Sequence, residues 1–156
     1  MQEHRRKKGF TLIELTIVIA LFVILGALTM LFGMNQYARS DFQAEQGTFI
    51  SLLERARAES MNNICLSKTC TDGKPHGVAR VGDSYVLFEG ATYSGRNKDV
   101  DAIFPASPAV SFEATGAIVF SELSGTTSGS TITLHDASDH VSLITIGSEG
   151  DIHWSR

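Results

Sequence analysis

The sequence predicts an α+β protein in which a long amino-terminal helix, transmembrane in its first half, precedes an antiparallel β-rich globular domain. Three observations support this prediction. Residues 15–34 contain no ionisable group, residues 35–62 continue with an amphipathic helical pattern, and the remainder alternates short apolar strands with turn residues. A hydrophobic period of three to four residues indicates a helix, whereas a period of two indicates a strand, so the change near residue 63 divides the chain.

The apolar run has the length of a membrane span. At about 1.5 Å rise per residue, residues 15–34 cover roughly 30 Å, the thickness of a hydrocarbon core. Four basic residues precede the run and only Arg39 follows it closely. The positive-inside rule therefore predicts a cytoplasmic amino terminus and an exported carboxy-terminal domain. A plain signal-anchor helix is an alternative; a cleaved signal peptide fits poorly, because the run is too long and no small-residue cleavage site ends it.

Charge is divided unevenly along the chain. Residues 1–9 carry four basic residues and Glu3, a formal charge of +3, and the whole chain carries −4, which leaves −7 for residues 10–156. At 156 residues the chain has room for one domain and an anchor. An acidic domain argues against nucleic-acid binding, since that affinity depends on Lys and Arg at the phosphates.

The apolar helix is expected to continue beyond the membrane. Residues 35–62 contain no proline, and apolar side chains recur at steps of three and four residues with charged residues between them. This pattern is typical of a helix with one face against a core, so we expect one helix of about 50 residues.

The second half is predicted to consist of short antiparallel strands. We expect strands over 78–81, 84–89, 110–113, 117–122, 131–136, 140–146 and around Ile152 and Trp154, with loops over 91–108 and 123–130. The pair Gly82-Asp83 between two strands is a hairpin signal. We expect the apolar runs 86–88 and 118–120, together with Trp154, to lie in the core.

Residues Gly9-Phe10-Thr11-Leu12-Ile13-Glu14-Leu15 resemble the processing site of type IV prepilins and type II secretion pseudopilins. The resemblance implies that a prepilin peptidase cleaves between Gly9 and Phe10 and methylates the new amino group of Phe10. It also implies a pilin-like fold with four parts: a cleaved leader (1–9), a transmembrane and filament-core helix (10–34), an amphipathic helix continuing into the domain (35–62), and a β-rich periplasmic domain (63–156).

Glu14 is the one ionisable residue of the apolar segment. A charge inside a bilayer costs a few kcal/mol on insertion scales, so an acid there indicates a function. Phe10 and Glu14 share a helix face at a spacing of four residues. The family resemblance implies that Glu14 neutralises the amino terminus of a neighbouring subunit during assembly. Pairing within one chain and a protonated, neutral Glu14 are the alternatives.

The β-rich half resembles the GspH/FimT family of minor pseudopilins and pilins. The resemblance is carried by the cysteine-bearing turn after the helix, by Val110-Ser-Phe with Gly116, and by Ile144-Thr-Ile-Gly with Gly150-Asp-Ile152. It implies a structural subunit whose partners are other pilin or pseudopilin subunits, the prepilin peptidase and the inner-membrane assembly platform. Residues 10–34 contain no proline, unlike many pilins, which favours a minor role. The protein is expected in the bacterial inner membrane and then in a filament.

Cys65 and Cys70 are expected to form a structural disulfide that closes a small loop after the helix. The predicted topology places them outside the cytoplasm, where disulfides persist. The alternatives are two free thiols, or a zinc site in which His76 would be the nearest further ligand.

We expect no catalytic residues, no metal and no cofactor, and therefore no enzyme. The chain has no G-x-S-x-G, P-loop or H-E-x-x-H motif. Two groups of residues could bind a metal or act catalytically. A metal site or hydrolytic dyad is conceivable for one group, and a calcium site for the other. The first group is His135, Asp136, Asp139, His140 and His153, and the second is Asp99 and Asp101. We interpret both groups as polar residues at strand ends and turns.

The alternative function is that of a DNA-binding minor pilin for DNA uptake. Family members with that role depend on an arginine-bearing stretch near the carboxy terminus, whereas residues 150–156 offer only Arg156. We therefore expect no nucleic-acid partner. A membrane-tethered enzyme is a third hypothesis, for which the sequence supplies no catalytic constellation.

Overall fold

The computed structural model describes residues 10–68, 72–113 and 116–155, without the side chains of residues 30–36 and 38. It divides into two compact units, Met1–Ala38 and Arg39–Arg156. One helix of 50 residues, α1 (Leu12–Met61), begins in the first unit and ends in the second. The predicted α+β, pilin-like architecture, an apolar helix followed by antiparallel sheets, is confirmed.

The described strands of the second unit form two antiparallel sheets of four strands. One has the order β3-β2-β1-β5 and the other β4-β6-β7-β8. The bounds are β1 (His76–Val81), β2 (Ser84–Glu89), β3 (Ala102–Pro105), β4 (Val110–Glu113), β5 (Ile118–Phe120), β6 (Ser130–Asp136), β7 (Val141–Ile146) and β8 (Ile152–Ser155), with a short 3-10 helix, η1 (Lys98–Val100).

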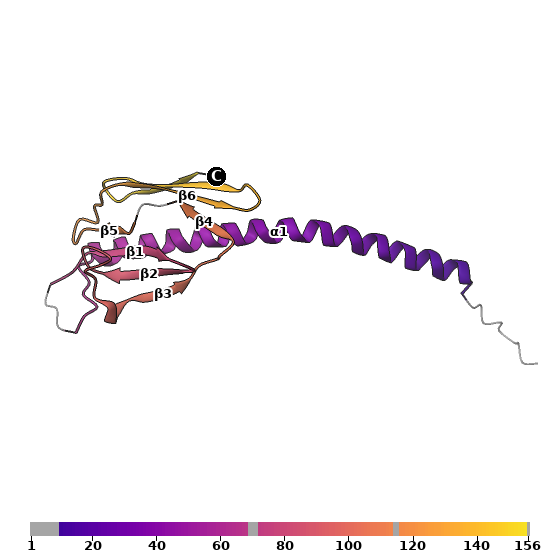
Figure 1. Cartoon of the computed structure of the whole chain (residues 1–156), viewed down its shortest axis with the longest axis horizontal. Coiled ribbons are helices and arrows are strands. Elements are labelled where there is room, and N and C mark those ends of the chain that lie inside the picture. Colours follow the sequence, from indigo (N-terminus) through magenta and orange to yellow (C-terminus); the bar gives the residue numbers. More distant parts are fainter. Residues whose placement is uncertain (1–9, 69–71, 114–115, 156) are drawn as a thin grey trace, which may run out of the picture. The chain divides into compact units, whose positions relative to one another are not determined.

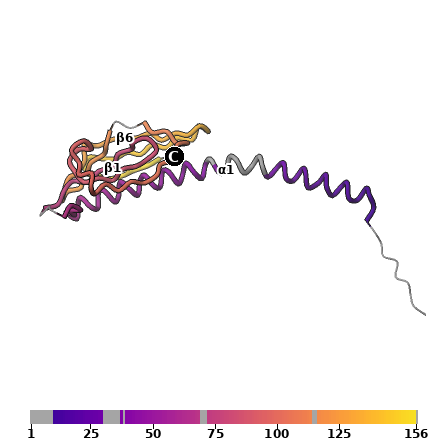
Figure 2. Tube along the Cα trace, turned by 60° about the horizontal axis from the view of Figure 1, so that its bottom comes forward, coloured from indigo at the N-terminus to yellow at the C-terminus, as the bar shows by residue number. Residues whose placement is uncertain are grey.

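The second half of α1 lies along both sheets and supplies one side of the core (Figures 1 and 2). Phe49, Leu53 and Ala56 follow each other at steps of four and three residues, so they share one helix face, and all three are buried. They belong to a single cluster with inward side chains of both sheets: Val78, Tyr85, Leu87, Ile118, Phe120, Ile132, Leu134, Ile144 and Ile146. The core therefore depends on the helix as much as on the strands.

Backbone hydrogen bonds after its last turn end the helix α1. The N–H of Ile64 donates to the carbonyl of Glu59 at 3.0 Å, and the N–H of Asn63 donates to that of Ser60 at 3.1 Å. Asn63 has a φ of 52°, the left-handed conformation that asparagine tolerates better than most residues. These bonds form a Schellman motif, which turns the chain from α1 toward β1.

The Gly82-Asp83 hairpin prediction is confirmed. Val81 lies opposite Ser84, and β1 and β2 pair along their whole length. Gly82 has a φ of 57°, which glycine adopts without steric cost. The runs 86–88 and 118–120 contribute to the two core clusters, as predicted.

Two sequence predictions about the β-rich half were wrong. The predicted loop 91–108 contains β3, an edge strand that ends at Pro105; proline is compatible with an edge because no further strand needs its N–H. Trp154 was expected in the core, but it is 51% exposed because β8 is also an edge strand, with no described strand beyond it. The successive strands β4 and β5, moreover, join different sheets.

Leu53→Ala should destabilise the second unit by about 3 kcal/mol, because it removes apolar surface and leaves a cavity in the core. The Leu53 side chain is 0% exposed. The matched control is Leu143→Ala on β7, where the side chain is 41% exposed and the expected loss is below about 1 kcal/mol. Urea unfolding of the full chain in detergent measures both; equal losses would contradict the packing described above.

Candidate functional site

The first turn of α1 is fixed by Thr11. Its hydroxyl oxygen accepts a hydrogen bond from the N–H of Glu14 at 3.3 Å, and its carbonyl accepts one from Leu15 at 3.2 Å. Thr11-Leu12-Ile13-Glu14 has the T-x-x-E spacing of a capping box, a sequence signal that marks the start of a helix. A carboxylate in the first turn also interacts favourably with the helix dipole. Glu14 thus has a local role in addition to any assembly role.

The apolar part of α1 is uncovered in the isolated chain. Residues Leu12–Thr29 have a mean hydropathy of 2.6, and none of them is buried. Phe10 is 88% exposed and Phe22 is 70% exposed. Each exposed Å² of such surface costs about 25 cal/mol in water, so this helix needs lipid or other helices around it. Its length and composition suffice to cross a membrane.

Glu14 has no partner of opposite charge in the described chain. Among residues 10–68, 72–113 and 116–155, no Lys, Arg or His lies within ion-pair distance of its carboxylate. Gly9, and therefore the predicted cleavage bond between Gly9 and Phe10, lies outside the described residues.

The disulfide prediction is not tested. Cys65 follows the end of α1, and none of the described cysteines is free, but Cys70 lies outside the described residues. The pairing of Cys65 with Cys70 stays a prediction.

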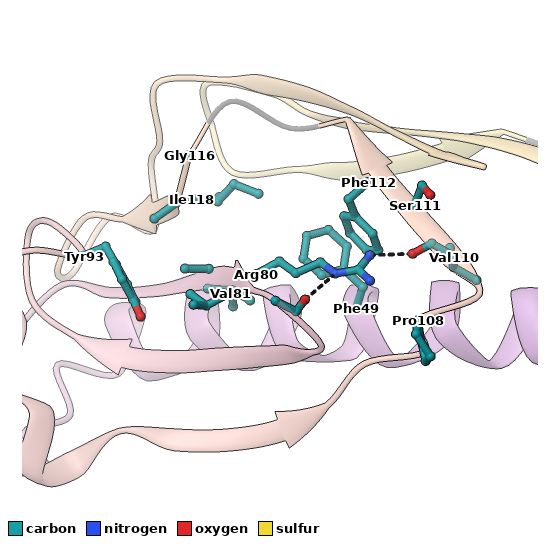
Figure 3. A pocket seen from close by; sticks show the side chains of 14 residues that line it. Phe49, Arg80, Val81, Tyr93, Pro108, Val110, Ser111, Phe112, Gly116 and Ile118 are labelled. Atoms are coloured by element: carbon teal, nitrogen blue, oxygen red, sulfur yellow. Dashed lines mark hydrogen bonds between the residues drawn. The ribbon is translucent and has the colours of Figure 1, made fainter. Parts of the chain in front are cut away.

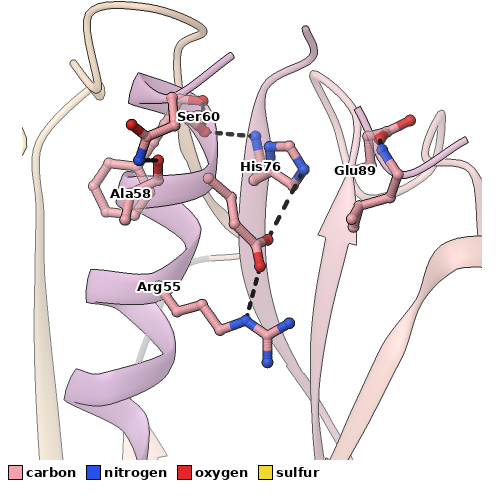
Figure 4. Close-up of polar contacts among 9 residues, drawn as sticks. Arg55, Ala58, Ser60, His76 and Glu89 are labelled. Carbon is pink, nitrogen blue, oxygen red and sulfur yellow. Dashed lines mark hydrogen bonds and ion pairs between the residues drawn. The ribbon is translucent and has the colours of Figure 1, made fainter. Parts of the chain in front are cut away.

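A buried polar cluster joins the end of α1 to β1 (Figure 4). The hydroxyl of Ser60 accepts a bond from the N–H of His76 at 2.8 Å and donates to the carbonyl of Phe120 at 3.0 Å. The Nε2 of the fully buried His76 lies 3.9 Å from Oε2 of Glu59, whose Oε1 is 2.8 Å from Nε of Arg55. These interactions connect the end of α1 with β1 and β5, which are distant in sequence, so the cluster stabilises the fold.

The other histidines and acids considered as metal ligands pair locally. His140 lies 2.8 Å from Asp136, His153 lies 2.9 Å from Asp151, and Asp101 lies 2.8 Å from Arg96. His135 is on β6, Asp139 forms the turn between β6 and β7, and Asp99 is in η1. No group of three or more His, Cys, Asp or Glu side chains suited to a metal occurs within the described part of the chain.

Asp136 should make stability depend on acidic pH. Burial alone would raise the pKa of Asp136, but hydrogen bonds from His140 and Ser138 outweigh burial and lower it. The stabilisation is therefore present above the unfolded-state pKa of about 3.9 and is lost as the pH falls through the lower folded-state pKa. Asp136→Asn should lack this contribution. The difference between the urea midpoints of wild type and variant should become smaller as the pH is lowered from about 5 to about 2. A difference that does not change with pH would contradict this role of Asp136.

Comparison with known proteins gives one match. A family model described as the prokaryotic N-terminal methylation motif matches residues 4–30. No curated protein and no solved structure matches this chain. The matched residues include the basic residues 5–8, Gly9, Phe10, Glu14 and most of the apolar part of the helix. The chain thus carries the methylation motif of prepilin-type proteins, the class to which type IV pilins and pseudopilins belong.

Proposed function

We propose that this chain is a minor pseudopilin or pilin, a structural subunit of a type II secretion pseudopilus or a type IV pilus. The observation that carries the proposal is the coincidence of the methylation motif over residues 4–30 with a fully exposed apolar helix. The apolar part of that helix, Leu12–Thr29, contains one carboxylate, Glu14, which has no partner of opposite charge among the described residues. A helix of this kind needs two successive environments, first lipid and then the helices of sister subunits.

The proposed mechanism is mechanical rather than catalytic. The helix inserts into the inner membrane with the leader in the cytoplasm, and the peptidase removes residues 1–9 and methylates Phe10. The inner-membrane assembly platform then transfers the helix from lipid to the filament core. Gly26 has open space around it in the isolated chain, so its lack of a side chain serves no internal packing and leaves room for close approach of a neighbouring helix.

Membership of the GspH/FimT branch is part of the proposal. It is supported by the sequence segments around Cys65, Val110 and Ile144 and by the two antiparallel sheets that follow a long helix. The carboxy-terminal domain would then lie in the periplasm, with other pilin or pseudopilin subunits as its partners.

Mass spectrometry of the protein isolated from its own cells tests the proposal. We expect an amino terminus at Phe10 carrying one methyl group, and recovery of part of the protein with a sheared or purified filament. Loss of secretion in a deletion strain would identify a secretion pseudopilus, whereas loss of surface pili would identify a type IV pilus. A protein that keeps residues 1–9 and stays in the membrane fraction would refute the proposal.

A further inference from the structure

A groove with a volume of about 670 Å³ lies between edges of the two sheets in the second unit (Figure 3). Its lining is mainly apolar and aromatic, with one cationic side chain at its centre. The residues that matter here are Phe49, Val78, Arg80, Tyr93, Phe112 and Ile118. Side chains from both faces of β1 contribute to the lining, so the groove passes around the edge of this strand.

The edge of β1 is open where it lines the groove. β5 pairs with β1 over His76, Gly77 and Val78, and no described strand pairs with the rest of β1 on that side. In an antiparallel ladder, successive residues direct their N–H and C=O groups to opposite sides. Val81 and Ser84 close the two-residue hairpin, so the N–H and C=O of Val81 point toward β2. The N–H and C=O of the preceding residue, Arg80, therefore point away from β2, toward the open side. No hydrogen bond from the main chain of Arg80 to another described residue is found there.

The edge of β4 faces the same groove. β4 is the end strand of its sheet and pairs only with β6. The carbonyl of Val110 points away from β6, since it accepts a bond from Nη1 of Arg80 at 2.7 Å. By the same alternation, the N–H and C=O of Phe112 also point away from β6. The side chain of Arg80 therefore connects two sheet edges that are not joined by main-chain bonds.

The guanidinium of Arg80 can still donate hydrogen bonds to a further partner. Its guanidinium donates to the carbonyls of Val110, Ser107 and Gly82 at 2.7, 3.1 and 3.3 Å, and it lies 4.4 Å from the ring of Phe112. These three bonds leave other guanidinium N–H groups free to donate. Within the described chain no carboxylate lies at ion-pair distance from Arg80. A partly buried guanidinium bonded only to carbonyls favours a carboxylate as its next partner.

We propose that this groove accepts an extended polypeptide segment of a partner protein, which carries alternating apolar side chains and one carboxylate for Arg80. The main-chain N–H and C=O groups of Arg80 on one edge and of Phe112 on the other can pair with those of an added strand, the recognition mode known as β-augmentation. The apolar lining would receive alternate side chains of that segment. The described strands of this chain are all paired in its own sheets, so a second copy has no free strand among them to donate. The inference goes beyond the proposed function, because it depends only on the second unit and holds whether or not the chain enters a filament.

Titration with a defined peptide tests the inference. The ¹⁵N-labelled full chain in detergent micelles is titrated with a synthetic peptide of about six residues. The peptide alternates valine and threonine around a central glutamate and has blocked ends. We expect the amide resonances of Arg80 and Phe112 to shift and their hydrogen exchange to slow. A peptide with lysine in place of the glutamate should bind at least about tenfold more weakly, and one with a central proline should not protect these amides.

A charge-reversal pair provides the matched variants. Arg80→Glu should abolish binding of the glutamate peptide, whereas Lys98→Glu, the same charge change at an exposed residue of η1, should leave it unchanged. Equal binding of the glutamate and lysine peptides, or no effect on the Arg80 and Phe112 amides, would overturn the inference. Should Arg80→Glu not fold, the amide protection measured in the wild type still decides the question.

Discussion

The variant Gly9→Val should accumulate as an uncut precursor that retains residues 1–9. A membrane peptidase has to hold the scissile bond in an extended pose, and a residue without a side chain offers least steric resistance beside that bond. A β-branched side chain at this position restricts the backbone and adds bulk where the enzyme must approach. We expect processing to fall below detection, and the intact mass of the protein from cells shows directly whether the leader is present.

The matched control is Gly26→Val, in the exposed apolar helix. A Cβ at Gly26 has nothing within 4 Å, so this variant introduces the same side chain without a clash inside the chain. It should be cleaved normally, even if its later packing in a filament is altered. Cleavage of Gly9→Val at the wild-type rate would show that the resemblance at residues 9–15 does not mark a processing site.

The two halves of this chain differ in how far sequence alone determines them. The helix was predictable because its period is local: the apolar residues from Leu12 to Thr29 and the buried face with Leu53 are evident in any short window. The Gly82-Asp83 hairpin was predictable for the same reason, since a two-residue turn fixes the register of its strands.

Contacts between segments that are distant in the sequence were harder to predict. The strands β4 and β5 follow each other closely in sequence, yet one pairs with β6 and the other with β1. Nothing in their local pattern indicates this choice, because it depends on which sheet has a free edge. The exposure of Trp154 has the same origin: its burial depends on whether another strand lies beyond β8. The role of Arg80 was likewise hidden, because its partners Ser107 and Val110 lie far away in the sequence.

Glu14→Ala should be cleaved after Gly9 but should fail to enter filaments. In the proposed mechanism the peptidase acts near Gly9 and Phe10, whereas the carboxylate would be needed later, when the methylated amino terminus is neutralised away from water. Leaving an ammonium group buried without its partner costs several kcal/mol, and each 1.4 kcal/mol corresponds to about a tenfold loss of association. We expect incorporation to fall by at least about a hundredfold, measured as the ratio of variant to wild-type protein in purified filaments.

Two companion variants distinguish the possible roles of Glu14. Glu14→Gln preserves size but cannot become charged, so it should fail like the alanine variant if the carboxylate is the active form, and should assemble if the neutral acid is sufficient. Glu54→Gln makes the same substitution at an exposed position of α1 in the second unit and should assemble normally. Both Glu14 variants keep the backbone N–H of residue 14 that donates to the Thr11 hydroxyl. They lose the favourable interaction of the carboxylate with the helix dipole, which contributes only about 1 kcal/mol or less, too little for an all-or-none defect. Normal incorporation of both Glu14 variants would therefore show that the intramembrane acid does not guide assembly, and the proposed mechanism would lose its central interaction.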